Sequence, residues 1–113
     1  MTGDGAVEVV DVPERNVYEI RVDGKVIGQE FYFDVGVQRA FYATEVDPAF
    51  GGRGLGGVLI HDALADAVAG NRRIVPICPF VVRWVGKHNE FATSIDELMP
   101  ALLQRIPALP KSK

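Results

Sequence analysis

Apolar and polar residues alternate along the chain from Asn16 onward. The segment "VYEIRVD" has a period of two, which is typical of a strand with one buried face. It ends at Asp23-Gly24, a strong signal for a two-residue hairpin turn. The segment "KVIGQEFYFDV" is therefore expected to return as a second, antiparallel strand, with Gly28 as a candidate bulge.

A third strand is expected in "QRAFYATEV", because Gly36 marks a second chain reversal. Pro48 then ends strand pairing, since proline has no N–H to donate. Residues 1–15 are mixed in character, and we expect a short strand around residues 7–10. Successive strands joined by tight turns form an antiparallel meander.

The period changes to that of a helix at Leu55. Apolar residues then recur at steps of four until Gly70-Asn71, which predicts the helix end. "RRIVPICPF" follows as a short apolar run, which is typical of a buried strand. A strand, a helix and a second strand form a crossover, so we expect this last strand to lie parallel to residues 39–46. The apolar positions of the helix are Leu55, Leu59, Ala63 and Ala67.

The C-terminal part of the chain is predicted to be helical. Residues 80–91 have the pattern of a second helix, and residues 94–105 that of a third, with Ser94 and Glu97 as a capping box. Beyond the third helix, the proline- and lysine-rich end is expected to fray. Residues 92–113 are therefore predicted to form a C-terminal helix and a frayed tail.

Length and composition favour one domain. A chain of 113 residues with 48% hydrophobic residues can bury one core, so we predict a single domain over residues 1–113 with its core at about 16–91. The net charge of -3 gives no indication of a nucleic-acid partner. No apolar run approaches the roughly 18 residues of a membrane span, and the acidic start does not resemble a signal peptide. A monomer is the default.

Cysteine and histidine usage narrows the chemistry. Cys78 is the one cysteine, so no intrachain disulfide can form, and a reducing, cytoplasmic setting is expected. One cysteine and two distant histidines cannot build a zinc site, so we predict no metal.

Five glycines lie within residues 51–57, directly before the predicted helix. The first N–H groups of a helix have no partner within it, and glycines let the backbone curl close to a bound group, so this loop can form a nest for phosphate oxygens, with Arg53 adding charge. The alternative is a plain strand-to-helix turn. The loop lacks the Gly-Lys-Ser/Thr of a nucleoside-triphosphate P-loop. It also follows an antiparallel meander, whereas the dinucleotide fingerprint needs a doubly wound parallel sheet.

Two blocks of the sequence resemble one family. "TEVDPAFGGRGLGGVLI" (Thr44–Ile60) closely resembles motif A of the Gcn5-related N-acetyltransferases, and "RRIVPICPFVVRWVGKHNEF" (Arg72–Phe91) resembles the tail of a small, compact subfamily. The resemblance runs from roughly Asn16 to Phe91. It implies a minimal acyl-CoA N-acyltransferase-like fold: a mixed α/β (α+β) domain whose meander leads into a strand-helix-strand crossover. The two parallel strands splay apart in this superfamily, a place where the missing N–H of Pro76 does no harm.

The resemblance also implies roles in binding acetyl-CoA as cosubstrate. Main-chain groups of Glu45 and Val46, at the end of the third strand, are expected to pair with the pantetheine arm, and a strand amide near Val46 to polarise the thioester carbonyl. The pyrophosphate is expected to bind the backbone amides of Gly52, Arg53, Gly54, Leu55, Gly56 and Gly57.

Two side chains are candidates for proton transfer. Cys78 ends the last buried strand, where it can protonate the departing thiolate or carry the acetyl group; the alternative is an inert core residue. Glu45 can accept the proton of the amine, or be a solvated strand-end acid. His88 is interpreted as a helix cap, and Trp84 as core packing.

Three alternative functions are consistent with these expectations. The first is an N-acetyltransferase in which an amine attacks the thioester of acetyl-CoA directly. The second is a catalytically silent module that binds CoA or senses acyl-CoA. Two features favour it: Ala43 replaces a histidine frequent in the subfamily, and the acceptor wall of larger family members is truncated here. Gly51 replaces the usual Gln or Arg of the motif, which removes a polar contact near the phosphates. The third is a small interaction domain whose glycines only form a turn.

Overall fold

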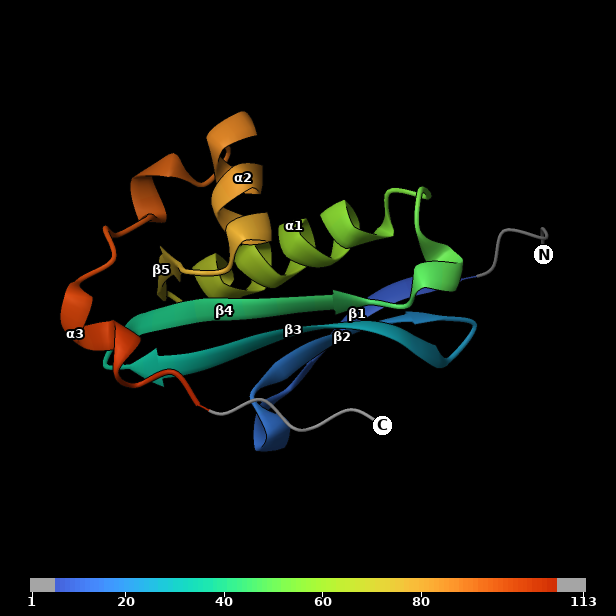
Figure 1. The fold of residues 1–113 in the computed structure, drawn as a ribbon, viewed down its shortest axis with the longest axis horizontal. Helices are drawn as coiled ribbons and strands as arrows, with labels where there is room; N and C mark the ends of the chain where they lie inside the picture. The colour runs from blue at the N-terminus through green and yellow to red at the C-terminus, as the bar shows by residue number, and fades with distance from the viewer. Residues whose placement is uncertain (1–5, 108–113) are drawn as a thin grey trace.

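The computed structural model of the chain describes residues 6–107, which form a five-stranded sheet in the order β1-β2-β3-β4-β5 (Figure 1). The strands are β1 (Val7–Val12), β2 (Val17–Val22), β3 (Lys25–Val35), β4 (Gln38–Val46) and β5 (Arg73–Pro76). The helices are α1 (Leu55–Ala69), α2 (Pro79–Lys87) and α3 (Pro100–Leu103), with 3-10 turns at Pro13–Arg15, Pro48–Phe50 and Ala92–Ser94.

β2, β3 and β4 form the predicted antiparallel meander, and β1, which is longer than the short strand expected around residues 7–10, pairs antiparallel to β2. Asp23 and Gly24 both have positive φ, 53° and 83°, which suits a tight two-residue hairpin turn. The pairing of β2 with β3 shifts beside Gly28, as predicted for a bulge. A Cβ at Gly28 would lie 2.9 Å from the Glu45 carbonyl oxygen, so the close approach of β4 requires glycine there.

The predicted crossover is also confirmed. α1 leads into β5, which pairs parallel to β4 from Gln38↔Arg73 to Phe41↔Pro76. α1 ends at Gly70, and Asn71 takes the left-handed conformation with φ 63°. α1 and α2 lie on the same side of the sheet (Figure 1), and the core between α1 and the sheet includes Tyr32 and Phe41.

The predicted helix over residues 94–105 is wrong, because tertiary contacts hold this segment extended. Ile95 forms a parallel bridge with Ile74, and the N–H of Asp96 donates to the Ile74 carbonyl at 2.7 Å. The side chain of Asp96 accepts hydrogen bonds from Arg73 and Gln38. The helix therefore shrinks to α3, which begins at Pro100, and no side chain caps it.

α3 helps to cover the second face of the sheet. Leu102 belongs to a small core cluster there with Phe33, Ala40 and Val75. The second predicted helix is shorter than expected, since α2 ends at Lys87. The fraying expected for the end of the tail falls on residues 108–113, outside the described residues.

β4 and β5 part after Phe41. The Phe41 carbonyl accepts hydrogen bonds from the N–H groups of both Ile77 and Cys78, at 3.0 and 2.9 Å, and the chain then turns into α2. β4 continues to Val46 with β3 as its partner on one side and an open edge on the other. We call this open edge, together with the space beside it, the gap. The predicted splaying of the parallel strands is thus confirmed.

A bulge in β4 decides which main-chain groups face the gap. The pairing of β3 with β4 shifts at Tyr32, so one extra residue, Tyr42, enters β4. Beyond it, the N–H of Asp47 donates to the Ile27 carbonyl at 2.7 Å. Main-chain groups alternate between the two sides of a strand. The N–H and C=O of Glu45 therefore point toward β3, and those of Thr44 and Val46 point into the gap.

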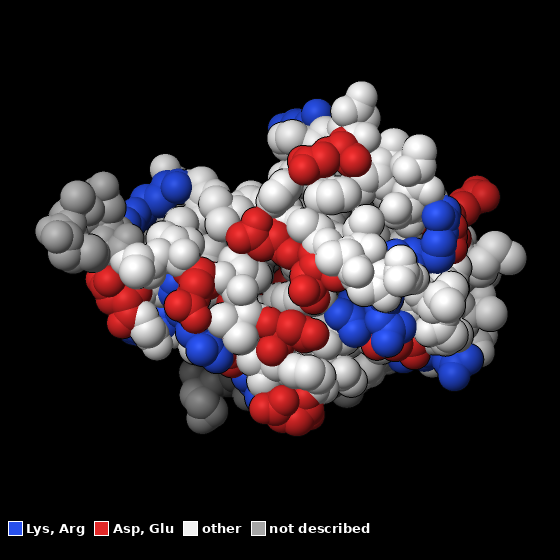
Figure 2. Space-filling model, turned by 180° about the vertical axis from the view of Figure 1, so that it is seen from behind, with Lys and Arg blue, Asp and Glu red and all other residues white. Residues whose placement is uncertain are grey.

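The surface carries mixed charges. Figure 2 shows acidic side chains gathered near the middle of the face seen from behind, with basic side chains toward its edges. None of the helices within residues 6–107 has the length and apolar character needed to cross a membrane.

Candidate active site

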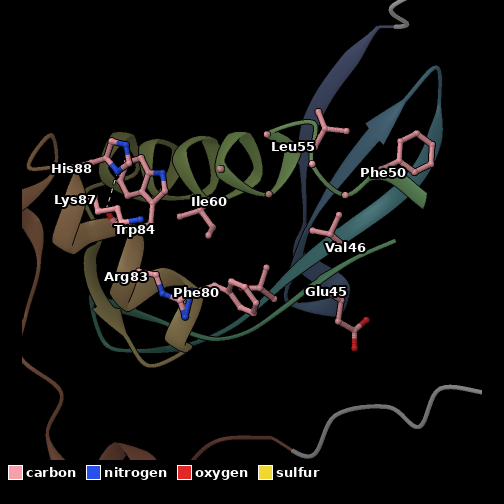
Figure 3. Close-up of a pocket in the computed structure, with 16 residues that line it drawn as sticks. Glu45, Val46, Phe50, Leu55, Ile60, Phe80, Arg83, Trp84, Lys87 and His88 are labelled. Carbon is pink, nitrogen blue, oxygen red and sulfur yellow. Dashed lines mark hydrogen bonds between the residues drawn. The ribbon is translucent and has the colours of Figure 1, made fainter. Parts of the chain in front are cut away.

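A cavity of about 730 Å³ opens where the end of β4, the glycine loop and α2 meet (Figure 3). We call it the groove. Its volume lies within the usual range for small-molecule sites. Its lining consists of Thr44, Glu45, Val46, Phe50, Gly51, Gly52, Gly54, Leu55, Gly56, Gly57, Ile60, Phe80, Arg83, Trp84, Lys87 and His88.

The glycine loop forms one wall of the groove. Gly52 and Gly54 have positive φ, 78° and 75°, a conformation in which a side chain would be strained. The first amide of α1 with a backbone partner is that of Val58, which donates to the Gly54 carbonyl at 3.2 Å. Within residues 6–107, none of the N–H groups of residues 52–57 has an acceptor in the protein. This run of free donors is suited to an anionic ligand.

Gly56 and Gly57 are not required by the packing of the protein itself. A Cβ at Gly56 would lie 3.9 Å from Val46 Cγ2, and one at Gly57 would lie 4.0 Å from Trp84 Nε1, both ordinary contact distances. Both glycines line the groove, so a side chain there would occupy space within it. The Arg53 guanidinium lies 5.3 Å from the centre of the ring of Phe50, a residue of the groove lining.

α2 supplies the opposite wall, which the sequence analysis did not find. Phe80, Arg83, Trp84 and Lys87 recur at steps of three and four, so they share one face of the helix and line the groove (Figure 3). The interpretation of Trp84 as core packing was thus incomplete. This spacing was the available signal, but an apolar helix face is more often explained by a core.

His88 confirms its predicted role as a helix cap and also lines the groove. Its Nδ1–H donates to the Trp84 carbonyl at 2.9 Å, and the two rings stack with centres 4.2 Å apart. The stacked pair fixes the orientation of the indole at the end of the groove.

Cys78 lies where the two strands part. It is 3% exposed and is the N-terminal cap residue of α2, two residues beyond the end of β5. Its Sγ lies 3.1 Å from Thr44 Oγ1, and Thr44 lines the groove. The Cys78 thiol therefore contacts a residue that lines the groove.

Glu45 is separated from Cys78 by the strand itself. Thr44 and Val46 project toward α1, so Glu45 projects from the opposite face of β4, and its carboxylate points away from the other labelled residues (Figure 3). Its side chain is exposed at the edge of the groove.

The comparisons with known proteins agree with this arrangement. The described fold is that of the acyl-CoA N-acyltransferases. It is similar to the NMR solution structure of a GCN5-like candidate N-acetyltransferase from Staphylococcus aureus, with a TM-score of 0.60 over 88% of this chain and 95% of that one. The two sequences are 18% identical, so this likeness shows the fold alone. No curated protein sequence matches the chain.

The family assignment rests on the sequence. The profile described as "GCN5-related N-acetyl-transferase" matches residues 17–94. This chain belongs to that family, so it is an acetyltransferase by family, and the predicted resemblance is confirmed. The matched range contains the glycine loop, the gap and Cys78.

Proposed function

We propose that the chain is an acetyl-CoA-dependent N-acetyltransferase, in which an amine attacks the thioester directly. The observation that carries the proposal is the run of free amides at residues 52–57, which lies in the same groove as the open edge of β4. Two independent sets of unpaired main-chain groups thus face one cavity. The free amides at the start of α1 are suited to an anion and the open strand edge is suited to an extended chain, so one ligand in this cavity could pair with both.

The glycine loop would hold the diphosphate of the cosubstrate. The amides of Gly52, Arg53, Gly54, Leu55, Gly56 and Gly57 supply the donors, and the positive end of the α1 dipole adds to them. Arg83 and Lys87 on the facing helix add two positive charges to the same groove. The residues present therefore fit a polyanionic ligand.

The open edge of β4 would hold the extended arm. The N–H and C=O of Val46 are directed into the gap, where they can pair with an amide-containing chain as a further strand would. Glu45 was expected to share this pairing, but its main chain is directed to β3 instead. When bound, acetyl-CoA supplies the activated acetyl group, and the Val46 amide would polarise its carbonyl.

Cys78 would protonate the departing thiolate. It lies at the point where the strands part and beside a hydroxyl of the groove wall. Glu45 lies on the other face of β4, so it would accept the proton of an amine that approaches from that side.

Ligand binding is tested first. Acetyl-CoA at 100 times its Kd should stabilise the chain by about 2.7 kcal/mol and raise its melting temperature. In an NMR titration the amide resonances of residues 52–57 should move, whereas those of the hairpin glycines Gly24 and Gly36, which also have positive φ, should not. An unchanged melting temperature together with unmoved loop resonances would contradict the proposal.

Catalysis is tested second, by thiol release with a panel of amines. Release that depends on the amine supports the transferase, and Cys78→Ala should slow it while binding is retained. Binding without amine-dependent release would instead identify a silent CoA-binding module. Ala43 favours that alternative, since it leaves no titratable side chain at this position beside the gap.

A further inference from the structure

Glu30 is a buried acid that the proposed mechanism does not yet use. It lies on β3 directly opposite Thr44 of β4 and is 0% exposed. Its Oε1 lies 2.5 Å from Thr44 Oγ1, and within residues 6–107 its Oε2 is buried with no hydrogen-bond partner. Leaving a buried carboxyl oxygen without a partner costs about 1–3 kcal/mol.

A second buried glutamate, Glu19, has a structural role and provides a comparison for the partners of Glu30. Glu19 on β2 is 7% exposed, and both of its oxygens are paired, with Arg15 at 2.7 Å and with Arg21 at 2.6 Å. In the part of the chain that the structure describes, no such cation pairs with Glu30. Burial raises the pKa of Glu30 to about 8, although its hydrogen bond with Thr44 lowers it in part, so the carboxyl is mostly protonated at neutral pH.

The hydroxyl of Thr44 connects Glu30 to Cys78. A hydroxyl has one hydrogen to donate. When Glu30 is protonated, it donates to Thr44 Oγ1, and Thr44 can then donate to Cys78 Sγ at 3.1 Å. The S–H of Cys78 is left free to point into the gap. When Glu30 is ionised, Thr44 donates to the carboxylate instead, and the chain of donors no longer leads to the sulfur.

We propose that Glu30 supplies the proton that restores the Cys78 thiol, and that this proton passes through the hydroxyl of Thr44. This role rests on the proposed function. As the amine forms its bond to the acetyl carbon, the carbon–sulfur bond breaks and its electron pair leaves with the sulfur. The leaving sulfur takes the Cys78 proton, Cys78 takes that of Thr44, and Thr44 takes that of Glu30. The carboxylate regains a proton from solvent between turnovers, and the surplus proton of the amine leaves to solvent or Glu45.

The energetics favour such a transfer. With its pKa raised to about 8, Glu30 holds a proton at neutral pH and can still release it, as a general acid near the operating pH does. An exposed glutamate would be several pKa units too acidic to hold the proton at neutral pH. Glu30 acts through Thr44 and Cys78 and is therefore a positioning and supply residue.

The test compares Glu30→Gln with the wild-type chain. Glutamine has almost the same shape but no transferable proton. Thiol release should be about 100-fold slower in this variant, with binding of acetyl-CoA unchanged. The acceptor should be a weakly basic aromatic amine, which does not itself titrate between pH 6 and 9. The wild-type rate should then fall as pH rises through about 8, and this fall should be absent in Glu30→Gln.

Two further variants test the path through Thr44. Thr44→Val removes the hydroxyl and should slow release like Glu30→Gln, whereas Thr44→Ser restores a hydroxyl and should retain most of the rate. If Glu30→Gln, Thr44→Val and Thr44→Ser all lose thiol release and all keep the pH profile of the wild-type chain, Glu30 and Thr44 have a structural role. That result would overturn the relay.

A readout without catalysis tests the protonation of Glu30 directly. Because its pKa is raised in the folded state, the folded chain binds more protons than the unfolded chain between pH 4.5 and 8, so thermal stability should decrease across that range. Glu30→Gln should remove this part of the pH dependence. A titration of the Glu30 carboxyl carbon near pH 4.5 would overturn the relay.

The outcomes separate the two proposals. Thiol release that is normal in Glu30→Gln would overturn the relay and leave the transferase standing. Absence of amine-dependent release by the wild-type chain would overturn the transferase, and the relay with it.

Discussion

The two ends of α1 differ in whether their polar groups have hydrogen-bond partners within the protein. At its C-terminal end, the N–H of Gly70 donates to the carbonyls of Asp66 and Ala67, and the Asp66 carboxylate accepts a hydrogen bond from Tyr18 at 2.7 Å. At its N-terminal end, the amides of residues 52–57 have no acceptor in the protein. The same helix thus has one end closed for stability and one end left open for a ligand.

The closed end continues into a network around Arg39. This residue is 8% exposed, donates to Tyr18 and Asp34, and lies 3.9 Å from the centre of the Tyr32 ring. Arg39 itself lies on β4 and these partners lie on β2 and β3, so the network fixes the relative positions of the three strands. Within residues 6–107, the buried side-chain oxygen without a hydrogen-bond partner is Glu30 Oε2, and Glu30 bonds to Thr44 of the groove lining.

The largest effect is expected at the closed end. Arg39→Met should reduce the free energy of unfolding by about 3–5 kcal/mol, because it leaves buried polar partners without their cation. Urea denaturation measures the change. Arg72→Met is the matched control, since Arg72 pairs with Asp34 at 3.3 Å from a more exposed position, and it should cost less than about 1 kcal/mol. Equal losses in both variants would contradict the network.

Gly56→Ala should separate stability from binding at the open end. Alanine has room there and favours a helix, so the free energy of unfolding should rise by about 0.5–1 kcal/mol. The new methyl group would occupy the groove, so the Kd for acetyl-CoA should rise about tenfold or more, as calorimetry can measure.

Gly86→Ala is the control for this pair of effects. Gly86 lies within α2, has nothing within 4 Å of an added Cβ and is not part of the groove lining. It should give the stabilisation without the change in Kd. Unchanged binding by Gly56→Ala would mean that the ligand does not contact the start of α1.

The charges of α2 should matter less than the shape of the loop. Replacing both Arg83 and Lys87 by Gln should weaken acetyl-CoA binding by about threefold to tenfold and reduce its dependence on salt, since exposed charges are screened. Titrations at low and high salt measure both changes. Arg105→Gln, beyond α3, should change neither, and an equal effect there would indicate a nonspecific charge response.

The smallest effect is expected at His61, which ties α1 to the segment after α2. Hydrogen bonds with Asp62 at 2.7 Å and with Glu90 at 3.0 Å raise the pKa of His61. This stabilisation is fully present below pH 6.5 and is lost as pH rises through the raised pKa. The imidazole is half-exposed, so His61→Ala should cost less than about 1 kcal/mol at pH 5 and nothing at pH 9. A cost that does not change with pH would contradict the ion pairs.

The meander and the crossover could be read from the sequence because local signals fix them. Asp23-Gly24 and Gly36 place the two hairpin turns, so the bounds of β3 and β4 follow directly. The helix at 94–105 could not be read correctly. Its capping pattern is local, whereas the bonds of Asp96 to Ile74 and Arg73 come from residues distant in sequence.

The glycine loop was predictable because its chemistry lies in one continuous segment. Glu30 was not, since both faces of the sheet are covered and strand alternation alone does not tell which face is buried more deeply. Its missing cation is a property of the surrounding strands. The face of α2 was missed for a similar reason, because Trp84 has the same spacing in a core and in a groove wall.

The two hydrogen bonds at the Phe41 carbonyl determine how far the gap extends along β4. The sheet cannot open further toward Arg39 without breaking both bonds, at a cost of about 1 kcal/mol each. The end of the gap near Phe41 is therefore held in place by these two bonds. In the proposed transferase, the acyl end of the cosubstrate would lie beside this closed end of the gap, which leaves room for a short acyl group.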